Sequence, residues 1–365
     1  MSKKKVICFF NSCESWGGGE KWHFEKSLRL HKEGYKTLII TNKKSELYKR
    51  LIKTPQKVKK IFISNFSFLN IFKLIYLVSL FKKQNVKVLI INLPSDLKIA
   101  GPAAKIANVD KIIYRRGSAI PIKDTFLNRF IFKNIVDEVI ANSFKTKETI
   151  LQNNSNFIEK NKIKVLYNGL DIKAFDNRNF KVLYNKKDNE IVLGNAGRLN
   201  KQKGQKFLID IAEQLKKRNI NFKILIAGSG NIKDDLINYA EKLNVRKEII
   251  FLNFVENIKD FMQSIDIFLL PSLWEGFGYV NIEAMVSYKP VVAFNISSNP
   301  EIIDDNKTGF LVEPYNVIDF VDRIEILCNN PKLRENFGIA GRKKVEEIFN
   351  EEKLFLQFEN IINNI

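Results

Sequence analysis

A stretch near residue 280 combines residue types that can bind an anion. Pro271–Pro290 reads PSLWEGFGYVNIEAMVSYKP. The apolar run Ile265–Leu270 predicts a buried strand before it, and the run from about Tyr279 to Tyr288 predicts a helix within it. A turn between a strand and a helix N-terminus offers free backbone N–H groups and the positive end of the helix dipole. The pattern therefore predicts an anion site.

Two carboxylates flank this turn. Glu275 precedes the predicted helix, Glu283 lies in its first turns, and Gly276, Phe277 and Gly278 stand between them. Carboxylates accept hydrogen bonds from hydroxyl groups, so the pair would suit a sugar or a ribose. An ordinary strand–turn–helix unit with two solvated glutamates explains the same residues.

Two further glycine-rich loops carry candidate chemistry. Arg198 and Lys203 lie five positions apart in Gly197–Gly204 (GRLNKQKG). Near the start, Gly17–Gly19 separates the first predicted strand from the first predicted helix, where backbone can approach a phosphate or a sugar. This turn is not G-x-G-x-x-G, and no acidic residue closes the second strand, which argues against an NAD-dependent dehydrogenase.

The elements that must position these residues alternate between strand and helix. The first half contains the predicted strands Lys5–Phe10, Lys36–Thr41, Lys59–Ser64, Lys87–Asn92, Lys111–Arg115, Glu138–Ala141 and Lys164–Tyr167. The second half contains Ile191–Asn195, Phe222–Ala227, Ile249–Leu252, Ile267–Leu270, Pro290–Phe294 and Gly309–Val312. Such alternation predicts an α/β fold with two Rossmann-like, doubly wound parallel sheets facing across a cleft. Ligands of such sheets bind at the carboxyl ends of the strands.

The domain boundaries follow from where this alternation stops. We expect a first domain over residues 1–170, a linker over 171–189 and a second domain over 190–350. The linker is polar and has no sustained period. The C-terminal helix, about residues 351–365, is expected to pack back onto the first domain.

Composition bounds the class of protein. The chain has 365 residues, is 45% hydrophobic, and contains three cysteines without a CxxC pair and two histidines. These numbers argue against a disulfide framework, a zinc site and a histidine-rich metal centre, and they suit a reducing cytoplasm. The N-terminal run VICFF is too short for a signal peptide, and the apolar region 66–81 is broken by Asn70 and Lys73. We therefore expect a chain that is soluble or bound to a membrane surface.

The positive charge is concentrated in the first half. The net charge is +20; residues 1–170 hold 33 lysines and arginines against 12 acidic residues, whereas the remainder holds 27 against 28. The predicted helix Asp124–Asn134 also interleaves aromatic and basic residues, namely Phe126, Phe130 and Phe132 with Arg129 and Lys133. This asymmetry indicates an anionic partner, which could be lipid headgroups, a phosphorylated acceptor or nucleic acid. A solvated lysine-rich surface is the alternative.

Several motifs, taken together and in order, resemble one known family. They are GGGE near the start, ANS at Ala141–Ser143, VLYNGLD at Val165–Asp171, GRLNKQKG, AGSG at Ala227–Gly230, the stretch with its two glutamates, and NPEII and TGFLV within Asn299–Val312. The sequence resembles the retaining glycosyltransferases of the GT-B fold from the bacterial group 1 family, glycosyltransferase family 4. The resemblance covers essentially the whole chain, and the glutamate pair is its most specific single motif.

The resemblance implies a site for a nucleotide-diphosphate sugar in the second domain. Arg198 and Lys203 would clamp the diphosphate, where positive charge stabilises the leaving group. Glu283 would accept hydrogen bonds from the donor ribose, and Glu275 would contact the transferred sugar. The remaining donor-binding residues that the resemblance implies are Gly17, Gly18, Gly19, Gly228, Gly230, Val255, Gly276, Phe277 and Gly278. Each cation or glutamate could instead be a surface or structural residue, and Glu275 could pair with Lys203.

One motif departs from the family. Many members carry a histidine after the strand equivalent to Ile112–Arg115, whereas this chain reads YRRG and neither of its histidines lies nearby. Arg116 would take the histidine's place, with Arg115 beside it, as acceptor-binding residues. Arginine cannot act as a base, so the departing phosphate would have to take the acceptor proton, as retaining enzymes of this fold are thought to do.

These observations lead to one functional hypothesis and two alternatives. We expect a metal-independent, retaining hexosyltransferase that uses a UDP- or GDP-sugar and a saccharide or lipid-linked acceptor in lipopolysaccharide or capsule synthesis. It would be cytoplasmic, and could be peripheral on the inner face of the cytoplasmic membrane. A sugar-nucleotide epimerase of the same fold would need carboxylates and a histidine in the cleft. A basic module binding nucleic acid or an anionic surface would leave the loop with Arg198 unused, and no nucleic-acid recognition motif is evident.

Overall fold

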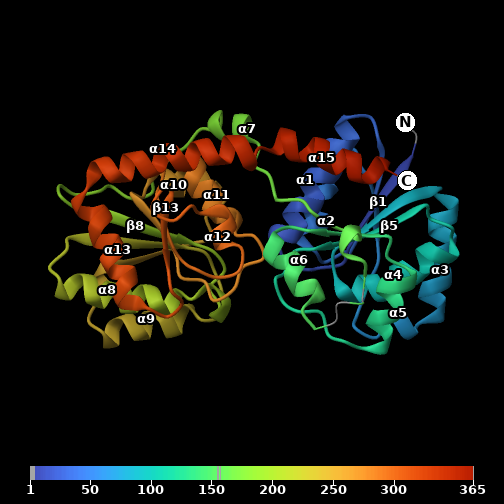
Figure 1. Ribbon diagram of the computed structural model, residues 1–365, viewed down its shortest axis with the longest axis horizontal. Coiled ribbons are helices and arrows are strands. Elements are labelled where there is room, and N and C mark those ends of the chain that lie inside the picture. The colour runs from blue at the N-terminus through green and yellow to red at the C-terminus, as the bar shows by residue number, and fades with distance from the viewer. Residues whose placement is uncertain (1–4, 154–155, 157, 365) are drawn as a thin grey trace. The chain divides into compact units, whose positions relative to one another are not determined.

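The computed structural model describes residues 5–153, 156 and 158–364, which form two compact units. The first unit comprises the chain up to Asn168 together with the segment from Leu354 onward, and the second comprises Gly169–Lys353. Figure 1 shows a sheet with helices on both sides in each unit. We describe each unit separately.

The first unit contains a seven-stranded sheet in the order β3-β2-β1-β4-β5-β6-β7, with every neighbouring pair parallel. Its strands are β1 (Val6–Asn11), β2 (Lys36–Thr41), β3 (Lys57–Lys60), β4 (Val86–Ile91), β5 (Lys111–Arg116), β6 (Glu138–Ala141) and β7 (Ile163–Val165). Its helices are α1 (Gly18–Lys32), α2 (Glu46–Leu51), α3 (Ile71–Lys83), α4 (Pro94–Ile106), α5 (Phe126–Asn134), α6 (Phe144–Leu151), the later part of α15 (Glu351–Asn363) and the short 3₁₀ helices η1 (Ser67–Leu69) and η2 (Lys160–Lys162).

The second unit contains a six-stranded parallel sheet in the order β10-β9-β8-β11-β12-β13. Its strands are β8 (Ile191–Ala196), β9 (Phe222–Ala227), β10 (Ile249–Asn253), β11 (Ile267–Leu270), β12 (Val291–Phe294) and β13 (Gly309–Val312). Its helices are α7 (Ile172–Asp176), α8 (Gln205–Lys217), α9 (Lys233–Lys242), α10 (Ile258–Gln263), α11 (Tyr279–Val286), α12 (Asn299–Ile302), α13 (Val317–Asn329), α14 (Pro331–Ile348), η3 (Lys201–Lys203) and η4 (Arg246–Glu248).

The apolar strands are buried on both faces, which is why they lack an alternating pattern. In β1, Cys8 and Phe10 join the core beneath α3, α4 and α5, whereas Ile7 and Phe9 join the core beneath α1 and α2. The C-terminal helix contributes to that second core: the Trp22 and Phe358 ring centroids lie 5.2 Å apart in an edge-on contact. Both predicted parallel sheets are therefore confirmed.

Each sheet has one point where the strand order changes direction. In the first unit β1 lies between β2 and β4, and in the second β8 lies between β9 and β11. The loops that leave the two strands at such a point diverge to opposite faces, so a crevice opens beyond their carboxyl ends. The loops after β1, β8 and β11 are the three glycine-containing stretches singled out in the sequence.

The segment 171–189, expected as a linker, belongs to the second unit. It contains the short helix α7, and its backbone bonds to side chains of α10 and the residue that follows it: Lys181 N–H donates to Asp260 Oδ1 at 3.1 Å, and Leu183 N–H to Ser264 Oγ at 2.7 Å. A segment without apolar period can be held through its backbone, and such contacts leave no pattern in its own residues.

Local differences from the predicted elements are small. The strand expected at 59–64 is β3, which ends at Lys60, because its pairing with β2 begins at Lys57. The helices α2 and α6 were not predicted, although Ser45 and Ser143 cap them by accepting from the backbone N–H three residues on. Within the described residues, no helix has both the length and the apolar character that crossing a membrane requires.

Candidate functional site

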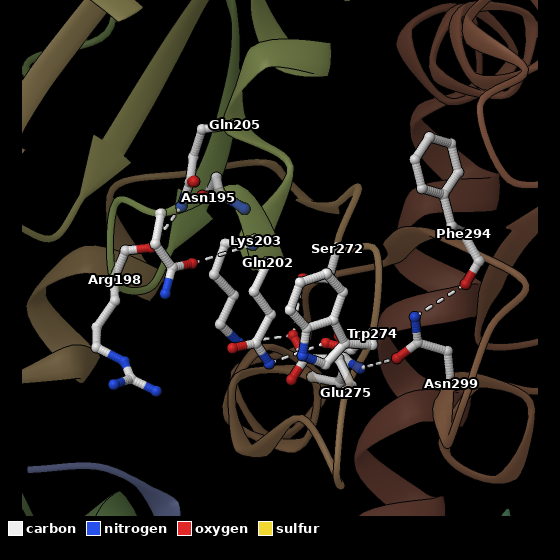
Figure 2. Close-up of polar contacts among 12 residues, drawn as sticks. Asn195, Arg198, Gln202, Lys203, Gln205, Ser272, Trp274, Glu275, Phe294 and Asn299 are labelled. Carbon is white, nitrogen blue, oxygen red and sulfur yellow. Dashed lines mark hydrogen bonds and ion pairs between the residues drawn. The ribbon is translucent and has the colours of Figure 1, made fainter. Parts of the chain in front are cut away.

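The loops after β8 and β11 are bonded to one another along their length. Leu273 N–H donates to the carbonyl of Gln202 at 2.8 Å, and Gln202 Nε2 donates to the carbonyl of Trp274 at 3.0 Å (Figure 2). Segments 197–204 and 271–278 thus form one rim at the change of strand direction.

Gly204 allows these two loops to meet. Its φ is +63°, and a Cβ at this position would lie 1.9 Å from the carbonyl oxygen of Pro271. Any other residue would therefore push the two loops apart. The glycine that closes GRLNKQKG is required by packing between loops.

An ion pair links the predicted diphosphate and sugar contacts. Lys203 Nζ lies 2.6 Å from Glu275 Oε1, which also accepts from Ser272 Oγ at 2.7 Å (Figure 2). The side chains are only 15% and 5% exposed, respectively. The structural alternative considered from the sequence, that Glu275 pairs with Lys203, is what this structure contains.

Arg198 is the cation of this rim that remains available. Its side chain is exposed and makes no hydrogen bond or ion pair with the residues that the structure describes. Its carbonyl accepts from Gln205 Nε2 at 3.0 Å, which fixes the backbone, and Figure 2 shows the guanidinium extended away from the Lys203–Glu275 pair. A guanidinium held in this way can donate two parallel hydrogen bonds to a phosphate.

The second predicted carboxylate lies inside α11. Glu283 is buried, with 7% of its surface exposed, in the helix that begins after Gly278. Gly278 has φ +75°, a conformation that favours glycine, and it turns the chain into the helix. The ring of Phe277 is buried against the ring of Phe349, with centroids 5.6 Å apart, so only the backbone at Phe277 can face a ligand. Gly276 completes the turn before it.

The glycines after β9 serve a close approach of backbone. A Cβ on Gly228 would lie 1.8 Å from the carbonyl oxygen of Gly197, and one on Gly230 would lie 2.0 Å from that of Leu199. The AGSG loop is therefore tied to the loop that carries Arg198. Val255, predicted near the nucleotide base, is half-buried in the loop after β10.

A group of buried amides beside the rim was missed by the sequence reasoning. Asn281 Nδ2 donates to Asn299 Oδ1 at 3.1 Å, and Asn299 Nδ2 donates to the carbonyl of Phe294 at 2.9 Å (Figure 2). Four buried oxygens near these strand ends have no hydrogen-bond partner among the described residues: Asn195 Oδ1, Gln205 Oε1, Asn281 Oδ1 and Ser298 Oγ. Asn281 lies in the stretch with the two glutamates, and Asn299 is the first residue of NPEII. Their residue type and their place in these motifs could have indicated a role at the site.

The first unit holds the glycine turn at the start of α1. Gly17 precedes the helix in an extended conformation, Gly18 begins it, and a Cβ on Gly19 would lie 2.6 Å from Asn92 Nδ2. The turn therefore packs against the loop after β4. These residues lie in a different unit from Arg198 and the glutamates.

Arg115, predicted as an acceptor contact, is buried in the structure. Its side chain is 2% exposed, and its guanidinium donates to Asn92 Oδ1 at 3.0 Å and to Asn168 Oδ1 at 3.1 Å. It also lies over the ring of Trp22, 4.9 Å from the centroid. Alternate residues of a strand face opposite sides of the sheet, so only one of the paired arginines could face outward.

Arg116 is that residue. It is partly exposed at the end of β5, and its guanidinium donates to the carbonyl of Ile120 at 2.7 Å and to the Tyr114 hydroxyl at 3.3 Å. These contacts hold the side chain at the carboxyl edge of the sheet without neutralising its charge.

His23, which is distant from YRRG in the sequence, is close enough to Arg115 in the structure to feel its charge. His23 of α1 is buried, and neither ring nitrogen has a hydrogen-bond partner among the described residues. Burial, together with the nearby charge of Arg115, holds the pKa of His23 well below its ordinary value of 6.5. The imidazole is therefore neutral at pH 7.

A buried carboxyl stabilises the start of the first glycine-rich loop. Asp96 is fully buried in the first turn of α4 and accepts from both Ser12 N–H (2.9 Å) and Ser12 Oγ (2.5 Å). Burial raises the pKa of Asp96 to about 7, although the two bonds from Ser12 oppose the shift. Nothing in the sequence singled this residue out.

No group of three or more histidine, cysteine, aspartate or glutamate side chains that could hold a metal ion occurs among residues 5–153, 156 and 158–364.

Each half of the chain matches a known protein family. Residues 16–174 match the family described as Glycosyltransferase Family 4, and residues 176–344 match the family described as Glycosyl transferases group 1. The chain is 30% identical to the poly(ribitol-phosphate) alpha-N-acetylglucosaminyltransferase of Staphylococcus aureus, over 61% of this chain and 47% of that protein. It is 31% identical to the capsular polysaccharide biosynthesis glycosyltransferase CapM of Staphylococcus aureus, over 62% of this chain and 61% of that protein. These alignments thus span about half to three-fifths of the relatives' length.

The fold is shared with solved structures. The Anabaena protein Alr3699/HepE, in complex with UDP and glucose, superposes with a TM-score of 0.82 over 99% of this chain and 100% of that one, at 20% identity. The predicted fold class, two parallel α/β sheets of the GT-B type, is confirmed. Together, the two matches show a region similar to Glycosyltransferase Family 4 at residues 16–174 and a region similar to Glycosyl transferases group 1 at residues 176–344.

Proposed function

We propose that this protein transfers a hexose-type sugar from a nucleotide-diphosphate sugar to a saccharide or lipid-linked acceptor, with retention at the anomeric carbon. The donor is a UDP- or GDP-sugar, and the product belongs to a lipopolysaccharide or a capsule. The second unit binds the donor and the first unit binds the acceptor. The reaction needs no metal ion.

The observation that carries the proposal is the available guanidinium of Arg198 beside the Lys203–Glu275 pair, on a rim at the carboxyl ends of β8 and β11. The two cations neutralise the charge that develops on the departing diphosphate. The Gly276–Gly278 turn and the start of α11 add backbone N–H groups on the same rim. Glu283 accepts hydrogen bonds from the ribose, and Glu275 from the transferred sugar.

The partly satisfied amides next to the rim support a polyhydroxyl ligand. Asn281 Oδ1 and Ser298 Oγ are buried and lack partners among the described residues. An unpartnered buried acceptor is costly, and hydroxyl donors of a sugar would complete both. The loop with Gly228, Gly230 and Val255 takes the nucleotide base.

The chemistry balances without a base from the protein. The acceptor oxygen forms a bond to the anomeric carbon as the bond from that carbon to the diphosphate breaks. The leaving diphosphate takes the bonding electron pair and then the acceptor proton on the same face. Arg198 and Lys203 stabilise its negative charge, so neither neutral His23 nor Arg116 needs to remove a proton.

The acceptor assignment draws on charge and on the relatives. The first 170 residues carry a large positive excess, and Arg116 offers a partly exposed guanidinium at the end of β5. The names of the two curated relatives specify an alpha-N-acetylglucosaminyl transfer to poly(ribitol-phosphate) and capsular polysaccharide synthesis. A polymer as acceptor or product fits the cytoplasmic enzyme that we propose, working at the inner face of the membrane.

The experiment is a transfer assay with a panel of UDP- and GDP-sugars and lipopolysaccharide or capsule fragments, in the presence of a chelator. We expect one donor to be consumed, with the anomeric configuration of its sugar kept in the product by NMR. Inversion would contradict the retaining mechanism, and loss of activity with the chelator would contradict metal independence. Conversion of one sugar nucleotide into another would favour the epimerase, and no turnover or donor-induced thermal shift would favour a non-catalytic binding module.

A further inference from the structure

The first unit exposes a group of large apolar side chains around η1 and α3. Phe72 is 81% exposed and Phe66 is 74% exposed. We call this group the α3 platform, and its members are Phe62, Phe66, Leu69, Ile71, Phe72, Ile75 and Tyr76. Isolated exposed apolar residues are common, but a group of this size on consecutive elements indicates an interaction surface.

Helix α3 is apolar on two opposite faces. Leu77, Leu80 and Phe81 are buried in the core beneath α4, and Figure 1 shows α3 on the outer side of α4. The positions i, i+1, i+4 and i+5 from Ile71 form the other face, and all four of those side chains are exposed. A surface helix ordinarily keeps its outer face polar, so packing within the first unit does not account for this face.

The chain segment that contains the platform carries basic and no acidic residues, and only Lys49, Arg50 and Lys87 of its basic residues form ion pairs, with Glu46 and Asp110 outside it, among the described residues. Residues 47–95 contain ten lysines and arginines and no aspartate or glutamate. Lys82 and Lys83 are exposed in the last turn of α3, and Lys57 of the edge strand β3 reaches the same end of the helix, donating to Gln84 Oε1 at 2.5 Å. Apolar side chains beside a group of basic residues are the combination that binds anionic lipid.

The platform is held in shape before it meets a partner. Lys73 Nζ donates to the carbonyl of Phe62 at 2.7 Å and to Ser67 Oγ at 3.2 Å, and Asn70 caps α3 by accepting from Lys73 N–H at 2.9 Å. These bonds join η1 to the start of α3. The backbone that carries the exposed side chains is therefore ordered before binding, which reduces the entropic cost of binding.

We propose that the α3 platform docks the first unit onto an anionic lipid bilayer, with its apolar side chains at the level of the headgroups. The proposal deepens the proposed function, on which it rests for the reason to visit a membrane: a lipid-linked acceptor. Nucleic acid fits less well, since aliphatic side chains such as Leu69, Ile71 and Ile75 do not stack on bases as aromatic rings do.

The platform replaces the helix that the sequence suggested for docking. In α5, Phe132 is buried against Tyr114, with ring centroids 5.7 Å apart, and Arg129 is paired with Asp124, Nε to Oδ1 at 2.5 Å. Phe126 is 87% exposed, but α5 lacks the continuous apolar face of α3. This contrast supplies a matched control.

The test is flotation of the full chain with vesicles of phosphatidylcholine containing about 30 mol% phosphatidylglycerol. Phe72→Ser is expected to weaken binding about tenfold, because a buried phenylalanine side chain is lost. Phe126→Ser, at an equally exposed ring on α5, is expected to bind as the wild type does. Both variants change exposed side chains, and circular dichroism melting is expected to show that both stay folded.

Salt and lipid charge complete the test. Binding is expected to fall several-fold when ionic strength rises from about 0.1 to about 1 M, which shortens the screening length from ~10 to ~3 Å. It is also expected to fall on vesicles of phosphatidylcholine alone. The proposal is overturned if vesicles do not float the protein, if Phe126→Ser weakens binding as much as Phe72→Ser, or if Phe72→Ser instead abolishes a dimer or nucleic-acid binding.

Failure of this inference and failure of the proposed function can be told apart. Arg198→Ala, which is expected to lose sugar transfer, is expected to bind vesicles normally. Vesicle binding without any transfer by the wild type would overturn only the proposed function. Transfer to water-soluble acceptors without vesicle binding would overturn only the α3 platform.

Discussion

Lys203 and Glu275 form a nearly buried ion pair, Nζ to Oε1 at 2.6 Å, although they lie 72 residues apart in the chain. The pair joins the loop after β8 to the loop after β11. If the two loops separated, each partner would lose the opposite charge that compensates its own. The two loops therefore behave as one element. The residues expected to contact the diphosphate and the sugar are therefore aligned before the donor binds.

Removing either partner of this pair is expected to destabilise the second unit. Lys203→Ala and Glu275→Ala should each cost about 3 kcal/mol, because each leaves one charge buried without its partner. The double variant should cost less than the sum. Calorimetry on the wild type and the three variants measures the coupling, and additive losses would mean that the pair does not join the loops.

Arg198 is expected to act on the reaction and not on stability. Arg198→Ala should lower kcat/KM by about 100-fold, the scale of losing one donor that stabilises developing charge. The melting temperature should stay at the wild-type value, because the side chain is exposed and makes no hydrogen bond or ion pair with the described residues. Lys201→Ala, at an exposed lysine of the same loop, is the control and should retain activity. Equal losses from both variants would point to general electrostatics instead of a specific clamp.

The glycines after β9 are expected to tolerate no side chain. Gly228→Ala should lower the melting temperature of the second unit sharply, because φ is +146° and the Cβ would lie 1.8 Å from the carbonyl oxygen of Gly197. Gly197→Ala is a matched control, since its Cβ would meet only the Lys203 stem at 3.4 Å. Differential scanning calorimetry compares the two, and an unchanged transition in Gly228→Ala would contradict the close approach.

The first unit is expected to lose stability as pH rises through the folded-state pKa of Asp96. Burial raises this pKa from 3.8 to about 7, so between these values the folded chain holds a proton that the unfolded chain has released. The free energy of unfolding therefore falls with increasing pH over this range. Asp96→Asn keeps an oxygen to accept from Ser12 N–H and does not titrate, so its stability should decline less over that window. Parallel pH profiles of the two proteins would refute this assignment.

The two arginines of YRRG are expected to separate into a structural and a functional residue. Arg115→Ala should lower the melting temperature of the first unit, because its buried guanidinium bonds to Asn92 and Asn168. Arg116→Ala should leave the melting temperature nearly unchanged and raise KM for the acceptor. Steady-state kinetics with varied acceptor measures this split. A normal acceptor KM in a well-folded Arg116→Ala protein would remove the arginine from the acceptor site.

Much of the fold could be predicted, because the order of strands and helices depends on patterns of apolar residues that are local in the sequence. The apolar runs of β1, β4, β8 and β9 predict strands that are buried on both faces of a sheet. The helical segments between them predict that neighbouring strands are parallel. The contacts of the segment 171–189 with the second unit could not be predicted, because its backbone bonds to Asp260 and Ser264 and such bonds do not depend on its own side-chain pattern.

The sequence could indicate candidate residues for the site, but it could not predict which of them contact one another. Glycine loops at strand ends and the residue types in them marked Arg198, Lys203, Glu275 and Glu283. The amides Asn281 and Asn299 were passed over, because a buried amide has no distinctive sequence pattern until its neighbours are known.

The sequence by itself determined the alternation of strands and helices, the glycine-containing loops and the uneven charge, because each depends on residues near one another in the chain. Only the tertiary structure decided that Lys203 pairs with Glu275, that Arg115 is buried while Arg116 is not, that His23 lies near Arg115, and that one face of α3 has no partner within its unit. Those outcomes depend on which distant segments pack together, and packing is set by strand order and register across the whole sheet.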